Sequence, residues 1–274
     1  MRLREALTAA SSRLAEVSDT SRLDAELLAA HLLDIDRNSL LLSYLDAEVP
    51  AGFLTLVDRR MTSEPVAYIL GHREFWTLDL KVLPGVLIPR PDSETLIEAA
   101  LKWFGPRAPA TILDLGTGSG ALLLAALSEF PEAEGMGVDQ SPTALAVAAE
   151  NATRCGFQAR VRLCAGNWGQ GVDGPFDLIL CNPPYISTDA ELPATVVHFE
   201  PREALFAGGD GLDDYRVLAP QIARLLSPTG CAVVEIGFDQ AQSAGALFRD
   251  AGLTVDVRPD LGGRDRCLIL TKSL

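Results

Sequence analysis

The sequence predicts an α/β fold in which a mostly parallel sheet is preceded by a small helical bundle and a β-hairpin. Three observations predict it. Apolar residues recur at helical spacing as far as about Thr62, aromatic and alternating residues follow between Pro65 and Pro91, and strand and helix patterns then alternate to the end of the chain. Such alternation favours a parallel sheet that helices cover on both faces. A chain of 274 residues with 48% hydrophobic content can fill one large core and one smaller core.

The helical domain is expected over residues 1–73. Four leucines recur there at helical spacing: Leu23, Leu27, Leu28 and Leu32. Ser21 is followed three residues later by Asp24, a pattern typical of a helix N-cap, and it favours several short helices over one long helix.

A β-hairpin linker is expected over residues 74–91. Residues 75–83 alternate between apolar and polar side chains, and Pro84 and Gly85 then mark a turn before the apolar residues 86–88. A helix from about Asp92 to Phe104 should follow.

The α/β domain is expected over residues 92–274. Its predicted strands are Thr111–Leu115, Gly135–Asp139, Arg160–Cys164, Phe176–Cys181, Cys231–Ile236, Thr254–Arg258 and Arg266–Thr271. Its further helices are predicted at Gly120–Glu129, Pro142–Arg154, Asp213–Leu226 and Gln240–Ala251. The turn at residues 262–266 is expected to join a hairpin at the edge of the sheet.

The charge balance argues against a protein that holds nucleic acid mainly through its phosphates. The formal net charge is −14, which is the wrong sign for that role, and we expect no direct sequence-specific binding to nucleic acid. Five cysteines without C-x-x-C spacing indicate neither a disulfide framework nor a zinc site, and no metal is expected. With no signal peptide or membrane span in the pattern, we expect a cytoplasmic monomer that does not bind membranes.

A glycine-rich segment lies where the first strand of the α/β domain turns into a helix. It comprises Gly116, Thr117, Gly118, Ser119 and Gly120, directly after Asp114-Leu115. Alternate glycines let backbone N–H groups approach a ligand closely. The same residues also satisfy a loose dinucleotide fingerprint, so this loop alone leaves the cofactor open.

The next two strands add candidate cofactor residues. Asp139 ends the second strand, where a carboxylate can accept both ribose hydroxyls of a nucleoside. It is not needed as a helix cap, because Ser141 and Pro142 already begin the next helix. Asn167 and Trp168 follow the third strand, where an amide and an indole could bind the edge and face of an adenine. Trp168 could instead cover the edge of the sheet.

The fourth strand runs into Asn182-Pro-Pro-Tyr185, at the end where open α/β sheets bind ligands. An amide or exocyclic amino nitrogen is a poor nucleophile, because its lone pair is delocalised. Two acceptors aimed at its N–H bonds, Oδ1 of Asn182 and the carbonyl of Pro183, favour methyl transfer to it from S-adenosylmethionine. Pro183 and Pro184 stiffen the backbone, and Tyr185 offers a face for stacking. A rigid exit turn is the alternative for an isolated Asn-Pro-Pro-Tyr.

With these motifs the chain resembles, over nearly its whole length, the protein-(glutamine-N5) methyltransferases of bacterial peptide chain release factors, the PrmC or HemK family. The resemblance also rests on the blocks Glu64–Gly71, Arg73–Trp76, Leu87–Glu94, Phe199–Leu205 and Gly208–Leu212. It implies a seven-stranded, Rossmann-like class I methyltransferase domain behind a helical domain that helps dock the release factor. The implied substrate is the glutamine of the Gly-Gly-Gln loop.

The resemblance also implies roles for individual residues. The loop from Gly116 to Gly120, with Asp139, Asn167, Trp168 and Asn182, would hold S-adenosylmethionine and its product S-adenosylhomocysteine. Residues 182–185 would grip the glutamine amide, with Arg90 and Glu94 lining the same pocket. Two positions depart from the family pattern: Asn167 stands where an acid is expected, and Ser93 stands where threonine is common. An Asn still accepts a hydrogen bond, and a Ser keeps the hydroxyl.

Three other functions are compatible with parts of the same sequence pattern. An adenine-N6 methyltransferase of nucleic acid makes the same demands on Asn182–Tyr185, but the charge and the lack of a second large domain weigh against it. An NAD-dependent oxidoreductase could use the glycine loop alone. A cofactor-binding partner of the translation machinery would bind the cofactor without turnover.

The histidines His31, His72 and His198 show no metal-ligand spacing and are expected to be structural or on the surface. The segment Glu200–Arg202 is expected to form a salt-bridged loop over the pocket, and a contact with the substrate is the alternative.

Overall fold

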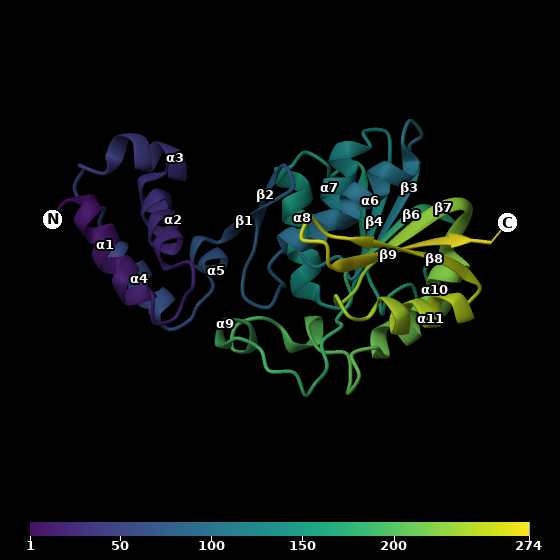
Figure 1. Cartoon of the computed structure of the whole chain (residues 1–274). Helices are drawn as coiled ribbons and strands as arrows, with labels where there is room; N and C mark the ends of the chain where they lie inside the picture. The colour runs from purple at the N-terminus through teal and green to yellow at the C-terminus, as the bar shows by residue number, and fades with distance from the viewer. Residues whose placement is uncertain (274) are drawn as a thin grey trace. The chain divides into compact units, whose positions relative to one another are not determined.

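The computed structural model describes residues 1–273, which form two compact units (Figure 1). The first unit contains Met1–His72 together with Leu192–Phe199. The second contains Arg73–Glu191 and the chain from Glu200 on. The assignment of residues 192–199 to the first unit was not expected from the sequence.

The first unit is a bundle of short helices, as predicted. Its helices are α1 (Leu3–Leu14), α2 (Ser21–Leu33), α3 (Arg37–Ser39), the π-helical turn η1 (Leu40–Tyr44), α4 (Phe53–Met61), α5 (Val66–Leu70) and α9 (Ala194–Val197). Leucines, alanines and Phe53 fill its core. Within residues 1–273, no helix is both long and apolar enough to cross a membrane.

Helix α2 differs from its predicted pattern in two ways. Ser21 is inside the helix and Thr20 takes the N-cap position without a side-chain cap, so the predicted Ser21 cap is wrong. Leu23 is 38% exposed, whereas Asp24 and Glu26 are buried. Asp24 pairs with Arg60, and Glu26 pairs with Arg22 and with a second arginine at position 37. The helix therefore buries two paired carboxylates together with Leu28, while Leu23, one of the four recurring leucines, is exposed.

A hairpin is present in the region of the predicted linker, but it turns at residues 76–77 and not at Pro84-Gly85, where the pattern placed the turn. It consists of β1 (His72–Phe75) and β2 (Leu78–Lys81), which form a sheet of their own. The hairpin begins before residue 74, and residues 82–90 form neither strand nor helix. The prediction of extended strand structure at residues 86–88 is thus wrong. These residues instead line the cavity described below.

The second unit contains the predicted seven-stranded sheet, in the order β5-β4-β3-β6-β7-β9-β8. Its strands are β3 (Thr111–Leu115), β4 (Glu134–Asp139), β5 (Val161–Ala165), β6 (Phe176–Cys181), β7 (Leu226–Glu235), β8 (Leu253–Pro259) and β9 (Asp265–Lys272). The strands pair in parallel from β5 to β7, and β9 runs antiparallel to both β7 and β8. The edge hairpin predicted around residues 262–266 is confirmed.

Helices cover both faces of this sheet (Figure 1). They are α6 (Glu94–Phe104), which follows the 3-10 turn η2 (Pro91–Ser93), then α7 (Ala121–Glu129), α8 (Pro142–Arg154), α10 (Asp213–Leu225) and α11 (Ala241–Asp250). A further 3-10 turn, η3, spans Arg202–Ala204. Residues of α6, α7 and α8 share one core with the sheet. Residues of α10 and α11 share the core of the opposite face.

The direction of strand order reverses between β3 and β6. From β3 the chain adds β4 and β5 on one side, and it then returns to add β6 and β7 on the other. Leu115 pairs with Cys181 at the carboxyl ends of these two strands. The glycine-rich loop and the Asn182–Tyr185 segment therefore leave the sheet side by side, at the place where open α/β sheets bind ligands.

Candidate active site

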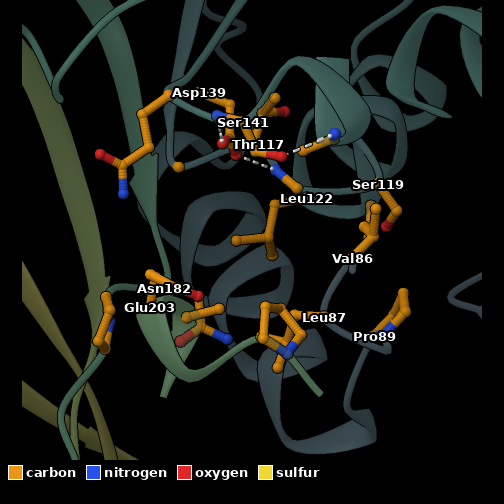
Figure 2. A pocket seen from close by; sticks show the side chains of 18 of the residues that line it. Val86, Leu87, Pro89, Thr117, Ser119, Leu122, Asp139, Ser141, Asn182 and Glu203 are labelled. Carbon is orange, nitrogen blue, oxygen red and sulfur yellow. Dashed lines mark hydrogen bonds between the residues drawn. The ribbon is translucent and has the colours of Figure 1, made fainter. Parts of the chain in front are cut away.

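A cavity of about 650 Å³ lies at this carboxyl edge of the sheet. Its size is typical of a site for a small-molecule ligand. Asp139 and Ser141 lie toward one end, Asn182 and Glu203 lie toward the other, and Leu122 lies between them (Figure 2). A molecule bound in the cavity can thus contact the ends of β4 and β6 at once.

The glycine-rich loop is pinned to the neighbouring strand. The backbone N–H groups of Gly116 and Thr117 both donate to the carbonyl of Val138, at 2.8 and 3.0 Å. Gly116 has a φ of +75°, and a Cβ atom there would lie 2.8 Å from the indole ring of Trp168. The backbone thus forms a floor against which Trp168 packs, and only glycine allows this approach.

Asp139 joins the two loops at this end of the cavity. One carboxylate oxygen accepts from the backbone N–H of Gly118 at 2.8 Å, and the other accepts from that of Ser141 at 2.9 Å. The hydroxyl of Ser141 caps α8, as predicted. Because a carboxylate oxygen can accept more than one hydrogen bond, both oxygens of Asp139 remain able to receive a hydroxyl donor.

Trp168 and Asn167 line the cavity beyond β5. The indole N–H of Trp168 donates to Asp214, 3.2 Å away on α10. Burial raises the pKa of Asp214, and this hydrogen bond opposes the rise. The ring is therefore held in place from both sides, by Asp214 and by the glycine backbone.

The Asn182–Tyr185 segment emerges beside the glycine loop. Asn182 and Pro184 line the cavity, whereas Pro183 and Tyr185 are not among its lining residues. The Nδ2 of Asn182 donates to Oγ of Ser93 at 3.0 Å. The Tyr185 hydroxyl donates to the buried carboxylate of Glu235 at 3.3 Å.

The backbone after this segment is fixed by the stretch at residues 205–213. The carbonyl of Tyr185 accepts from the side-chain amide of Gln240 at 3.0 Å. Gly211, with a φ of +71°, lies so close that a Cβ atom would be 2.4 Å from the same carbonyl oxygen. Ile186 forms an isolated parallel bridge with Phe206. The glycine-rich block at residues 208–212 thus supports the segment that carries Asn182.

Arg90 and Glu94 occupy different places. Arg90 lines the cavity and pairs with Glu200, which also accepts from the backbone N–H of Ile88. This confirms the predicted salt-bridged loop. The carboxylate of Glu94 accepts from the backbone N–H of Trp76 at 2.7 Å, and Glu94 borders a second, smaller cavity instead. The structure therefore does not bring Glu94 together with Asn182 in one cavity.

The placement of the remaining cofactor candidates follows the prediction, with one exception. The cavity is lined by Gly116, Thr117, Gly118, Ser119, Asp139, Asn167, Trp168 and Asn182. Gly120 is not among its lining residues and instead takes the N-cap position of α7. Within residues 1–273, no group of three or more His, Cys, Asp or Glu side chains is arranged to hold a metal ion.

Sequence reasoning missed three acidic residues at the site. Glu203 lines the cavity from η3, next to Ala204, and Asp214 lines it from α10. Glu235 ends β7 behind Asn182 and is 1% exposed. A single acid at the end of the apolar run Cys231–Val234 was a readable signal, because a buried carboxylate requires partners.

Burial dominates the electrostatics of two acids beneath the cavity. It raises the pKa of Glu235 to about 7, against the opposing effects of hydrogen bonding from Ser93 and the positive charge of Arg266. Burial likewise raises the pKa of Asp114 to about 7, and hydrogen bonding from Thr117 opposes it. One carboxylate oxygen of Asp114 is buried without a partner among the described residues.

The fold and the cavity define an α/β domain with a ligand-sized cavity at the carboxyl edge of its sheet, and comparisons with known proteins narrow the class of protein. Residues 107–244 match a methyltransferase domain, and residues 5–71 match the PrmC N-terminal domain. A solved methyltransferase from Pyrococcus furiosus is similar in fold, with a TM-score of 0.56 and 21% identity, over 72% of this chain and 90% of that one. The second unit is thus a methyltransferase domain, and the predicted fold class is confirmed.

Curated relatives identify the family. The release factor glutamine methyltransferase of Rhodospirillum rubrum is 45% identical over 254 residues, which cover 90% of this chain and 78% of that protein. The protein of the same name from Caulobacter vibrioides is 42% identical over 278 residues, covering 98% of this chain and 96% of that protein. The chain belongs to the release factor glutamine methyltransferase family.

Proposed function

We propose that this protein transfers a methyl group from S-adenosylmethionine to the side-chain amide nitrogen of the glutamine in the Gly-Gly-Gln loop of peptide chain release factors. The names of the curated relatives support the substrate. The single observation that carries the chemistry is the position of Asn182. Its side-chain amide lines the cavity, and its N–H group is already bound to Ser93.

The cavity fits S-adenosylmethionine in charge as well as in size. Asp139, Glu203 and Asp214 line it, and the guanidinium of Arg90 is matched by the carboxylate of Glu200. A negative lining favours a positively charged ligand such as a sulfonium. When bound, the cofactor supplies an electrophilic methyl group.

Individual residues would hold its parts. Asp139 would accept the ribose hydroxyls, since both of its oxygens are oriented by backbone N–H groups. Trp168 offers an aromatic face for the adenine, and Asn167 offers a hydrogen-bonding amide. The methionine end would extend from the glycine loop toward Asn182.

Asn182 and Pro183 would then act on the substrate amide. Oδ1 of Asn182 and the main-chain carbonyl of Pro183 can each accept one N–H of the glutamine side chain. Acceptors at both N–H groups favour the positive charge that develops on nitrogen during transfer, and oriented dipoles of this kind commonly provide a large share of catalysis. Tyr185 would flank the planar amide.

The first unit would contribute to docking of the release factor, and the protein would act as a monomer in the cytoplasm. The match of residues 5–71 to the PrmC N-terminal domain supports a role for this unit that is particular to the family. Remote docking would let binding energy from the whole release factor serve to position one side chain.

The decisive experiment is mass spectrometry of a purified release factor after incubation with the protein and S-adenosylmethionine. We expect one added methyl group on the glutamine of the Gly-Gly-Gln loop, lost with Asn182→Ala while S-adenosylhomocysteine still binds. Glu132→Ala, an exposed change that is not among the residues lining the cavity, is the control for nonspecific damage. If S-adenosylmethionine with a labelled methyl group transferred label to DNA or RNA but not to the release factor, the alternative of a nucleic-acid methyltransferase would be supported instead.

A further inference from the structure

A short run of hydrogen bonds behind Asn182 ends on a buried carboxylate. Nδ2 of Asn182 donates to Oγ of Ser93 at 3.0 Å, and the Ser93 hydroxyl donates to Oε2 of Glu235. Ser93 and Glu235 are 3% and 1% exposed. The three residues come from the end of β6, from η2 and from the end of β7, so the tertiary fold alone brings them together.

The inventory of donors dictates the direction of these bonds. Above the pKa of Glu235 its carboxylate is ionised and has no proton to donate, so the single hydroxyl proton of Ser93 goes to Glu235. Ser93 can then only accept from Asn182, and only the NH₂ end of an amide can donate to it. The oxygen of the Asn182 amide is therefore the end left to face the cavity. No residue within 1–273 donates a hydrogen bond to that oxygen.

The opposite orientation would be unproductive. It would turn the NH₂ group of Asn182 toward the cavity, where it would meet the N–H donors of an amide substrate. Both orientations have nearly the same shape, so packing alone distinguishes them poorly. The polarity of the hydrogen bond with Ser93 is what separates them.

We propose that Ser93 and Glu235 are positioning residues, which hold the Asn182 amide with its oxygen toward the substrate nitrogen. The proposal rests on the proposed methyl transfer to an amide nitrogen. Glu235 is itself held at both oxygens, since Tyr185 donates to Oε1 at 3.3 Å. The charges of Arg266 and Asp92 also act on it, Arg266 lowering and Asp92 raising its pKa. One carboxylate thus orients both ends of the Asn182–Tyr185 segment.

The first test compares Ser93→Ala with Ser93→Thr on the full-length protein and a whole release factor. Ser93→Ala removes the acceptor for Nδ2, and we expect kcat to fall roughly tenfold or more. KM for the release factor and Kd for S-adenosylhomocysteine should change by less than about threefold, because the contact acts mainly in the transition state. Ser93→Thr keeps the hydroxyl and should recover most of the lost kcat.

The second test uses Glu235. Glu235→Gln can still accept from Ser93 and donate to Tyr185, so it should lose less kcat than Glu235→Leu. Ser93→Ala combined with Glu235→Leu should be about as slow as the slower single variant, since both act through one amide. If Glu235→Leu does not fold, the Ser93 pair and Glu235→Gln complete the comparison.

The outcomes separate this proposal from the proposed function. Wild-type protein that methylates no release factor overturns the function itself. Wild-type activity in Ser93→Ala, or an equal loss in Ser93→Thr and Ser93→Ala, overturns the positioning role while leaving the function intact. Losses that multiply in the double variant would also overturn it.

Discussion

The carboxylate of Asp139 accepts a hydrogen bond from the backbone N–H of Gly118 at 2.8 Å, which ties the end of β4 to the glycine loop. Its other oxygen accepts from Ser141. The acid is thus oriented before any ligand binds. Preorganisation of this kind lowers the ordering cost of binding.

From this we predict that Asp139→Ala weakens binding of S-adenosylhomocysteine by roughly tenfold to a hundredfold, the range for loss of hydrogen bonds to a charged group. The affinity of Asp139→Asn should lie between those of the wild type and Asp139→Ala, because its amide oxygen can still accept a hydrogen bond. Isothermal titration calorimetry measures both. Equal affinity in all three proteins would show that Asp139 does not hold the ribose.

Gly116→Ala should reduce both stability and cofactor affinity. The added Cβ would lie 2.8 Å from the Trp168 ring, at a φ of +75°. Gly171 is a matched control, because its φ is +74° and nothing lies within 4 Å of its Cβ position. Each variant carries the strain of a left-handed backbone, about 1–2 kcal/mol. Only Gly116→Ala adds the clash, so similar urea midpoints and affinities in the two variants would contradict the proposed packing.

Stability should fall as pH rises between about 5 and 8. Burial raises the pKa of Glu235 from 4.5 to about 7 and that of Asp114 from 3.8 to about 7. The folded protein then binds more protons than the unfolded chain between these values, so raising the pH through this window favours unfolding. The nearby charges of Asp92 and Arg266 oppose each other at Glu235, and the hydroxyl of Tyr185 faces it.

Urea unfolding at pH 5 and pH 8 measures this effect. Glu235→Gln should reduce the difference between the two free energies of unfolding, whereas Glu134→Gln, an exposed acid at the start of β4, should leave it unchanged. A difference that is identical in wild type and Glu235→Gln would show that Glu235 titrates normally in the folded protein.

Loss of the buried pair in the first unit should be strongly destabilising. Asp24 and Arg60 are 4% and 7% exposed. Asp24→Ala leaves the guanidinium buried without its partner, which costs about 3–5 kcal/mol. Asp46→Ala removes the exposed partner of Arg4 and should change stability by less than about 1 kcal/mol. Thermal unfolding measures the loss of stability in each variant. Equal losses in Asp24→Ala and Asp46→Ala would mean that the buried pair is dispensable.

A short peptide carrying Gly-Gly-Gln should be a much poorer substrate than a whole release factor. If remote contacts position the glutamine, kcat/KM for the peptide should be lower by roughly a hundredfold or more. Methylation of both substrates at limiting concentration gives the ratio. Similar values would rule out a docking role for surfaces distant from the cavity.

Most strands of the α/β domain could be predicted from the sequence to within one residue, because apolar runs and turn residues alternate. The exception is β7, which begins at Leu226 and not at the predicted Cys231. The bounds of β3 and β6 agree with the prediction. The helical bundle was harder to predict in detail. Leu23 is exposed and Asp24 is buried because Arg60, distant in the sequence, neutralises the acid, and no local pattern records such a partner.

The same limit applies to the site. The sequence could predict that Asp139 and Asn182 line the cavity, because each stands at or just after the carboxyl end of a predicted strand. The lone acid Glu235 after an apolar run was a readable signal, but its contact with Ser93 could not be predicted, since the two lie 142 positions apart and meet only in the folded chain. Glu94 was predicted beside the substrate from its place in a sequence block, but its carboxylate is bound to the backbone of Trp76.

The pairing of Leu115 with Cys181 has a consequence for how this enzyme can vary. Neighbouring strands lie about 4.8 Å apart, a spacing set by backbone hydrogen bonds rather than by side chains. The points at which the glycine-rich loop and the Asn182–Tyr185 segment leave the sheet are therefore set by its backbone. Substitutions in either loop can change which side chains line the cavity, while the sheet keeps the two loops side by side.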